Sequence, residues 1–259
     1  MRPWKLAETN YRFTKEHSFE VAVLPLGATE PHNLHLPYGT DTYEADAVGE
    51  QICEAATTRG ARVVLLPTMP YGTETNQMAF PLAMNVQPST LGAVVKDLVA
   101  ALVHHGIRKI VLLNGHGGND LKWLLRELYG QTPAQLFLCN WYQVLADAYP
   151  KIFEDAGDHA GEMETSMILA YHPDLVARKA DGTLDADDGV MAKTLFDAVN
   201  RGWVSITRPW EKLTTNSGAG NPHPATAEKG REVMRLLVER LSTFLVDLSA
   251  APLDERFPY

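Results

Sequence analysis

Short apolar runs alternate with longer helix-period segments along the first half of the chain. Near-continuous apolar stretches at residues 19–26, 62–66, 109–113 and 134–139 predict buried parallel strands, because both faces of such strands are covered. Segments 42–58, 89–105 and 120–129 lie between or after these strands and carry apolar residues at helical spacing. This repeated strand–helix–strand order predicts an α/β fold with a mainly parallel central sheet.

The second half is predicted to be mainly helical. Apolar residues recur at helical spacing in segments 162–171, 187–200 and 225–248. Between the last two segments lies the loop TTNSGAGNPHPAT, whose Pro224 and Thr226 are typical of a helix start. No repeat, low-complexity tract or linker divides the chain, so a single domain over residues 1–259 is expected.

Composition narrows the functional classes. The chain has 45% hydrophobic residues among 259, enough for a full core without metal staples, so a metal would be functional rather than structural. With 32 acidic against 23 basic residues, the net charge of −9 disfavours nucleic acid and anionic membrane surfaces as partners. Cys53 and Cys139 form no CxxC pair, and residues 1–13 lack a signal-peptide core. We therefore expect a cytoplasmic protein.

The loop after the first strand, GATEPHNLHLPYGTD, carries the first candidate metal ligands. In open parallel sheets, reactive groups gather in loops beyond the carboxyl ends of the strands. Glu30 and His32 are two residues apart and project to the same side of an extended segment. Asp41 precedes a helix and is either a third ligand or a helix N-cap. His35 is either a ligand or a histidine that braces the loop.

A second candidate, His116, lies in the segment NGHGGN between a predicted strand and a predicted helix. The flanking glycines allow the backbone to turn sharply and to approach a ligand closely. One interpretation is a metal ligand, and the other is an anion-binding turn at a helix N-terminus. The spacing is not GxGxxG, which disfavours a nucleotide.

The segment DHAGEMETS, residues 158–166, gathers His159, Glu162 and Glu164 at a predicted helix start. These residues either complement the helix dipole or supply a proton shuttle and a further oxygen ligand. Carboxylates and imidazoles without thiolates suit Zn, Mn or Fe. Two ions that share one carboxylate would lower the pKa of a water toward neutrality, as hydrolysis requires.

These motifs, in this order and followed by a Gly- and Pro-containing loop that leads into ATAEKG, resemble the creatininase (creatinine amidohydrolase) family over about residues 18–245. The resemblance implies a three-layer αβα sandwich with two divalent metal ions per subunit. Carried over, Glu30 and His116 hold one ion, His32 holds the second, and Asp41 bridges them. Creatininase has a glutamate ligand where this chain has Gly118. The resemblance points to Glu164 as its replacement and to His159 as the catalytic histidine, which protonates the leaving nitrogen.

The predicted function is therefore a metal-dependent hydrolase that acts on a non-peptide amide or cyclic amide C–N bond of a small molecule. His159 or Glu162 would handle the proton. Two alternatives remain: a formamide deformylase or peptidase with the same metal site, or a non-catalytic small-molecule-binding protein of the same fold. A serine hydrolase is disfavoured because no GxSxG motif is present. The resemblance also implies a homo-oligomer, a hexamer.

Overall fold

The computed structural model describes residues 1–259, and its centre is a four-stranded sheet in the order β2-β1-β3-β4. Every strand pairing is parallel, as predicted. The strands are β1 (Val21–Leu26), β2 (Val63–Leu65), β3 (Lys109–Asn114) and β4 (Gln135–Asn140). All four lie within two residues of the predicted segments, because continuous apolar runs mark strands that are buried on both faces.

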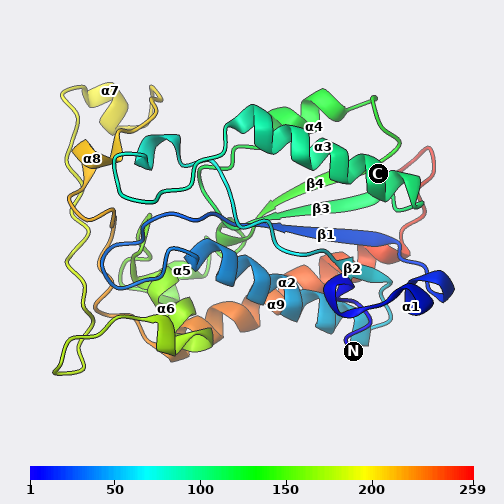
Figure 1. The fold of residues 1–259 in the computed structure, drawn as a ribbon, viewed down its shortest axis with the longest axis horizontal. Coiled ribbons are helices and arrows are strands. Elements are labelled where there is room, and N and C mark those ends of the chain that lie inside the picture. Colours follow the sequence, from blue (N-terminus) through cyan, green and yellow to red (C-terminus); the bar gives the residue numbers. More distant parts are fainter.

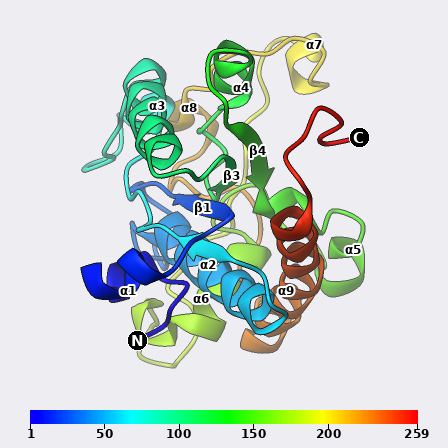
Figure 2. The ribbon, with the colours of Figure 1, turned by 90° about the vertical axis from the view of Figure 1, so that its right-hand side faces the viewer.

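Helices cover both faces of this sheet (Figures 1 and 2). One layer consists of α2 (Thr40–Thr58), α6 (Glu162–Tyr171) and α9 (Ala227–Ala250), and the other of α3 (Pro88–His104) and α4 (Lys122–Leu128). The remaining α-helices are short: α1 (Tyr11–Glu16), α5 (Tyr149–Ile152), α7 (Asp197–Asn200) and α8 (Trp210–Leu213). The three-layer αβα architecture is thus confirmed.

Alternation along the strands explains why both layers are needed. In β1, Val21 and Val23 belong to the apolar cluster formed with α2 and α9, whereas Ala22 and Leu24 belong to the cluster formed with α3 and α4. Successive side chains of a strand point to opposite faces, so an unbroken apolar run requires cover on both sides. Full burial of each large apolar side chain contributes roughly 1.5–3 kcal/mol.

The carboxyl ends of the strands point toward α5, α6, α7 and α8, at the left of Figure 1, while both termini lie at the opposite end. This is the edge at which the polar loops were expected to meet. The structure contains no helix with both the length and the apolar character that a membrane crossing requires.

The helix predicted at residues 187–200 is wrong over most of its length, because only α7, Asp197–Asn200, is helical there. Gly189 and Gly220 exchange two backbone hydrogen bonds, at 2.8 and 3.0 Å. Asn33 Nδ2 also donates to the carbonyl of Asp187 at 2.8 Å. These long-range bonds hold the start of the segment in an extended form against the loops of the site, which local periodicity does not reveal.

Candidate metal centre

Three loops and two helix starts bring the predicted ligands together. Glu30 and His32 follow β1, Asp41 is in the first turn of α2, and His116 follows β3. The possible ligand atoms form three overlapping groups, each with its atoms within 4.8 Å of one another: Glu30, Asp41 and His116; His32, Asp41 and Glu164; Glu30, His32 and His159. Asp41 belongs to the first two groups, the position that a bridging carboxylate would take.

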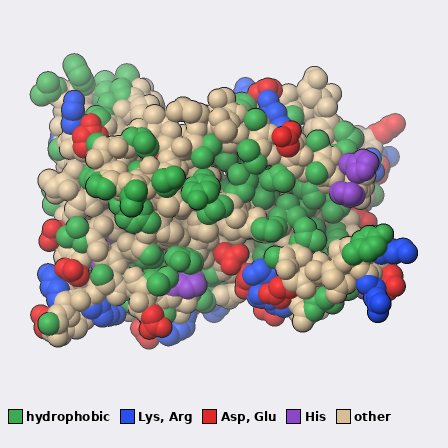
Figure 3. Space-filling model, viewed as in Figure 1, with side chains coloured by type: hydrophobic (Ala, Val, Ile, Leu, Met, Phe, Trp, Pro, Cys, Tyr) green, Lys and Arg blue, Asp and Glu red, His purple; other side chains and the backbone are tan.

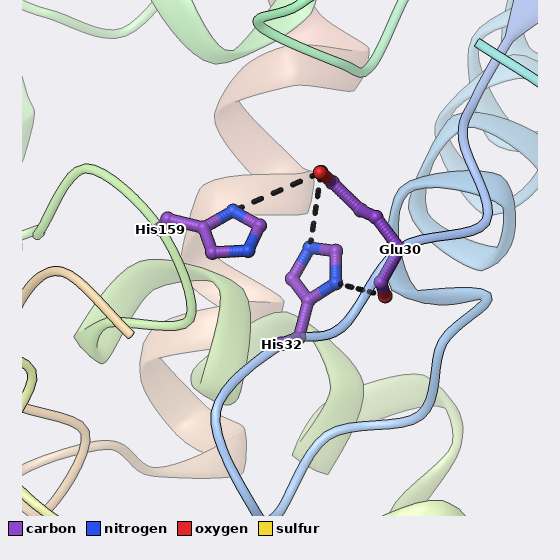
Figure 4. Close-up of side chains that lie close together, drawn as sticks. All are labelled: Glu30, His32 and His159. Atoms are coloured by element: carbon purple, nitrogen blue, oxygen red, sulfur yellow. Dashed lines mark hydrogen bonds and ion pairs between the residues drawn. The ribbon is translucent and has the colours of Figure 1, made fainter. Parts of the chain in front are cut away.

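Three histidines of this cluster each give one ring N–H to a main-chain carbonyl. The pairs are His116 Nε2 with Thr73 O at 3.1 Å, His32 Nδ1 with Glu30 O at 3.1 Å, and His159 Nε2 with Pro31 O at 2.8 Å. A carbonyl only accepts, so the nitrogen facing it carries the hydrogen and leaves the other nitrogen free to bind. The free nitrogens face the carboxylates, and Figure 4 shows those of His32 and His159 directed at Glu30.

In the group of Glu30, Asp41 and His116, the atoms that carry lone pairs lie too close together to be stable without a positive charge. His116 Nδ1 is 2.9 Å from both Glu30 Oε1 and Asp41 Oδ2. Asp41 Oδ2 is buried and makes no hydrogen bond. Buried lone pairs that face one another repel strongly in a medium of low dielectric constant. The donor set therefore fits a divalent cation, which would turn this repulsion into coordination.

The pKa values of these groups show the same demand for positive charge. Burial alone would lower the pKa of His32, but Asp41 and the other carboxylates outweigh it and raise that pKa to about 10. Against the same effect of burial, Glu30 and Asp41 raise the pKa of His116 well above its ordinary range. Burial would raise the pKa of Asp41, yet His32 and His116 hold it well below its usual value. In the metal-free chain, protons supply the charge that a metal ion would bring.

Gly118 has no room for a side chain. A Cβ there would lie 2.1 Å from Thr73 O and 2.3 Å from His116 Nε2, at the hydrogen bond that orients this histidine. A glutamate ligand at this position is sterically excluded. Glu164, in the first turn of α6, instead lies in one ligand group with His32 and Asp41. One of its oxygens also accepts a hydrogen bond from the main-chain amide of Ala160.

Glu162 lies outside the cavity, contrary to what its predicted role in proton transfer requires. It is fully buried, and one carboxylate oxygen pairs with Lys229 of α9. The other oxygen accepts from the main-chain amides of residues 154 and 155, at 2.9 and 3.2 Å. This side chain therefore ties the loop before His159 to α9.

His35 is buried but belongs to none of the ligand groups. Its Nε2 lies 2.8 Å from Thr165 Oγ1 of α6, a contact that braces the first loop against this helix. Of the two interpretations of His35 in the sequence, the geometry favours the bracing role.

Sequence reasoning missed two buried carboxylates beside the cluster. Glu74 is fully buried, with Oε1 3.8 Å from His116 Nε2, and burial raises its pKa to about 8. Glu44 follows Asp41 by three residues, and burial, Glu164 and Asp41 raise its pKa well above the usual range. Neither carboxylate has a hydrogen-bond partner. The signal for Glu44 was its spacing, since residues three apart on a helix share a face.

A cavity of about 290 Å³ opens beside the ligand cluster. Its lining includes ligand candidates, the amides of Asn76 and Gln77, and the aromatic side chains Trp141, Tyr142, Tyr149 and Trp210. The Trp210 ring stands edge-on to His159, with centroids 4.9 Å apart. A concave site with an aromatic wall and a few convergent polar groups is typical of small-molecule binding.

Unusual backbone conformations surround this site. Asn33, Ala160 and Ser217 have φ values of 55°, 51° and 66°. Such conformations cost about 1–3 kcal/mol each for non-glycine residues and persist where the surrounding structure enforces them. Ala160 directly follows His159, and its amide donates to Glu164, so the left-handed turn orients two residues of the site.

The fold and donor set define an α/β protein with a candidate divalent-metal centre at the carboxyl edge of its sheet. A family model described as creatininase, creatinine amidohydrolase, matches residues 7–245. The chain therefore belongs to the creatininase family.

Curated relatives have different stated activities. Creatinine amidohydrolase of Pseudomonas putida is 31% identical over 176 residues, which cover 60% of this chain and 66% of that protein. A mycofactocin precursor peptide peptidase of Mycolicibacterium smegmatis is 30% identical and matches 86% of this chain and 83% of that protein. A 3-dehydro-scyllo-inosose hydrolase of Thermotoga maritima is 24% identical, with 92% and 79% covered. All three are hydrolases by name.

Solved structures share the fold over nearly the whole chain. A Bacteroides fragilis protein described as a candidate creatinine amidohydrolase superposes with a TM-score of 0.89 at 35% identity, covering 98% of this chain and all of that one. A creatininase structure with Mn superposes with a TM-score of 0.74 at 23% identity, covering 96% and 99%. Another neighbour is a creatininase variant of Zn-Zn type. Metals are thus named for structural neighbours of this chain.

Proposed function

We propose that this protein is a metal-dependent amidohydrolase that cleaves the C–N bond of a small-molecule amide or cyclic amide. The observation that carries the proposal is the convergence of free histidine nitrogens on three carboxylates beside a cavity, two of which, Glu30 and Asp41, each belong to two ligand groups. Glu30, Asp41 and His116 would hold one divalent ion, and His32, Asp41 and Glu164 the second. Zn, Mn and Fe all suit these ligands. Bound there, the ions would polarise the amide carbonyl and acidify a water molecule.

His159 is the residue we assign to proton transfer. Its Nε2–H is held by the carbonyl of Pro31 at 2.8 Å, so Nδ1 is the nitrogen that exchanges protons. Nδ1 faces Glu30 Oε1 at 3.8 Å, and the ring lines the cavity. In hydrolysis this nitrogen would take the proton of the attacking water and pass it to the leaving nitrogen as the C–N bond breaks. Glu162 has no part in this step of the proposal.

Two further residues would hold the ligand and proton-transfer side chains in place without reacting themselves. One amide hydrogen of Gln77 bonds to Glu30, which leaves Glu30 Oε1 for the cluster. Ser217 Oγ donates to the Pro31 carbonyl at 2.5 Å, the same carbonyl that orients His159. These contacts would hold ligand and proton carrier at fixed positions, which is where such sites gain much of their rate.

The test combines metal analysis with an amide panel. Protein purified without chelators is expected to contain stoichiometric Zn, Mn or Fe, and to hydrolyse at least one member of a panel of linear amides, cyclic amides and formamides. Removal of the metal by a chelator should abolish turnover, and addition of the metal should restore it. Metal-free protein with full activity would refute the proposal. Bound metal without any turnover would favour a binding protein of the same fold.

A second candidate function is peptide-bond hydrolysis with the same centre. The observation in its favour is the similarity to mycofactocin precursor peptide peptidases over 86% of this chain. The cavity of about 290 Å³ has room for a small amide, which is the first substrate class to test. Short peptides with free and blocked termini belong in the panel because of this similarity.

We further propose that the protein works in the cytoplasm as a homo-oligomer, a hexamer by family resemblance. Apolar side chains of the segment around α7 are exposed, with Leu195 at 97% and Trp203 at 73%. Figure 3 shows hydrophobic side chains gathered at the upper left, where Figure 1 places α7. Light scattering should give a mass near six chains, and a monomer at micromolar concentration would contradict the assembly.

A further inference from the structure

Arg208 is the only lysine or arginine among the residues that line the cavity. It lies two residues before Trp210, whose side chain is buried at the start of α8. The guanidinium stacks over the Trp210 ring, with Cζ 5.3 Å from the ring centroid. The buried Trp210 ring therefore restricts the position of the Arg208 guanidinium.

Asp158 is the only partner of Arg208 outside this stack. Nη1 of Arg208 donates to Asp158 Oδ2 at 2.9 Å, and the remaining N–H groups of the guanidinium make no hydrogen bond to protein. Both side chains are about half exposed, 43% for Arg208 and 50% for Asp158. An ion pair with this exposure is weak, so a ligand anion with two oxygens can compete with Asp158 for the guanidinium.

Arg208 lies on the same side of the cavity as His159. The Trp210 ring on which Arg208 stacks stands edge-on to His159, and Asp158 directly precedes His159 in the chain. In the proposed mechanism, His159 delivers its proton to the leaving nitrogen. A group bound by Arg208 would therefore lie on the side of the cavity where the leaving nitrogen receives this proton.

From this geometry we propose that Arg208 binds a carboxylate on the amine portion of the substrate, so that the protein acts on N-acylated amino acids. The inference rests on the proposed function, since it assigns an anion subsite to the same cavity. A planar guanidinium with free N–H groups binds a carboxylate through two parallel hydrogen bonds, which an uncharged carboxamide cannot match. The carboxylate would also be attracted by the metal ions when they are present.

The chain offers a matched control for Arg208. Arg201 lies seven residues earlier, stacks over Trp203 at the same 5.3 Å, and pairs with Asp197 at 2.6 Å. It does not line the cavity. Replacement of Arg201 by alanine removes the same type of charge, stack and ion pair without touching the proposed subsite. Light scattering checks that the assembly is retained, since Trp203 lies on the exposed apolar surface around α7.

The experiment measures binding separately from hydrolysis. Methanesulfonyl-β-alanine and its carboxamide resist hydrolysis because a sulfonamide replaces the scissile amide. Calorimetry on the metal-loaded protein should show about tenfold tighter binding of the carboxylate form, the effect of charge-assisted hydrogen bonds. R208A should remove most of this preference and leave only the attraction by the metal ions, R201A should preserve it, and D158N should strengthen it by freeing the guanidinium. N-acetyl-β-alanine and its carboxamide then test the same preference in kcat/KM.

Each outcome decides the assignment. Equal or undetectable binding of both forms by the wild-type protein overturns it. If R208A weakens the binding of the carboxylate and the carboxamide ligands equally, the role of Arg208 is structural and the assignment is overturned. Weaker binding of the carboxylate ligand by D158N would also overturn the assignment. If the carboxylate preference depends on Arg208 but no amide in the panel is hydrolysed, the anion subsite stands and the proposed hydrolytic function fails.

Discussion

At the scale of single residues, the centre is defined by which nitrogen of each histidine is free. Thr73, Glu30 and Pro31 use their main-chain carbonyls to occupy the other nitrogen of His116, His32 and His159 respectively. Removing one of these rings therefore removes a defined function. His116 is a ligand in the proposal, whereas His159 carries the proton.

His116→Ala and His159→Ala are expected to fail in different ways. His116→Ala should lose bound metal together with turnover, because it removes one donor of a three-donor group and leaves Glu30 and Asp41 facing each other. His159→Ala should keep its metal and lose about 100-fold or more in kcat, the usual contribution of a general acid–base. Elemental analysis and initial rates on both variants check this. Unchanged turnover in His159→Ala would remove this residue from the chemistry.

Gly118 and Gly117 provide a second residue-scale prediction. Gly118→Ala should destabilise the protein by about 1–3 kcal/mol, the range for overpacking, because its Cβ would collide with the Thr73–His116 hydrogen bond. Gly117→Ala meets nothing within 4 Å and is the adjacent control. Thermal melting and metal content measure both effects. Equal behaviour of the two variants would contradict the steric account of why no glutamate stands at residue 118.

Several site residues were predictable from sequence because their loops follow buried strands. Glu30, His32, Asp41 and His116 were nominated in this way, and the structure brings all four together. Glu74 and Trp210 were not nominated. Their nearness to His116 and His159 depends on where two irregular loops fold back, and no periodicity encodes that path.

At the scale of elements, the position of Glu164 depends on how closely α6 and α9 cross. Gly230 of α9 lies against the main chain of α6, where a Cβ would stand 2.1 Å from Ser166 O. Ser166 Oγ also accepts from the amide of Thr226, the N-cap of α9, at 3.2 Å. The backbone of α6 is thereby fixed two residues after Glu164.

Gly230→Ala should therefore lower both stability and metal affinity. We expect a loss of about 1–3 kcal/mol from overpacking, with a larger metal requirement for full occupancy because Glu164 shifts with α6. Glu239→Ala, on the exposed face of α9, should change stability by only about 0.5 kcal/mol. Denaturant titration and metal titration measure the two effects. Wild-type values for Gly230→Ala would show that the helices can separate without consequence for the site.

Elements that are formed by local patterns were predicted well, and those formed by distant contacts were not. The helix predicted at 162–171 matches α6, Glu162–Tyr171, an apolar segment that packs mainly against α9 and α2. Segment 187–200 is mostly irregular, with a helix only at its end, and Gly189 pairs with Gly220 through backbone hydrogen bonds. Backbone bonds between glycines leave no trace in side-chain periodicity.

At the scale of the whole molecule, metal binding, protonation and stability are linked. In the metal-free chain the pKa of His32 is raised to about 10 from an ordinary 6.5. A raised folded-state pKa contributes stability that is fully present below 6.5 and is lost as the pH rises through about 10. A metal ion replaces this proton on the histidine nitrogen. Protons therefore compete with the metal ion less strongly as the pH rises over the same range.

The stabilisation by added Zn or Mn should therefore increase from about pH 6.5 to about pH 9. The difference in Tm between metal-loaded and metal-free protein measures this trend. Calorimetry in buffers with different ionisation enthalpies should also detect proton release on metal binding near neutral pH. A Tm difference that falls with increasing pH, or binding without proton release, would contradict the protonated state assigned to the metal-free histidines.

The three carbonyls that orient the histidines belong to the polypeptide backbone, and this has an evolutionary consequence. A substitution can change a side chain but not the oxygen of a peptide group. The hydrogen bonds that fix the imidazole tautomers are therefore retained as long as the loops keep their backbone conformation. The cavity walls, by contrast, are built from exchangeable side chains. Divergence can thus alter substrate preference freely while the reactive apparatus beneath it is conserved.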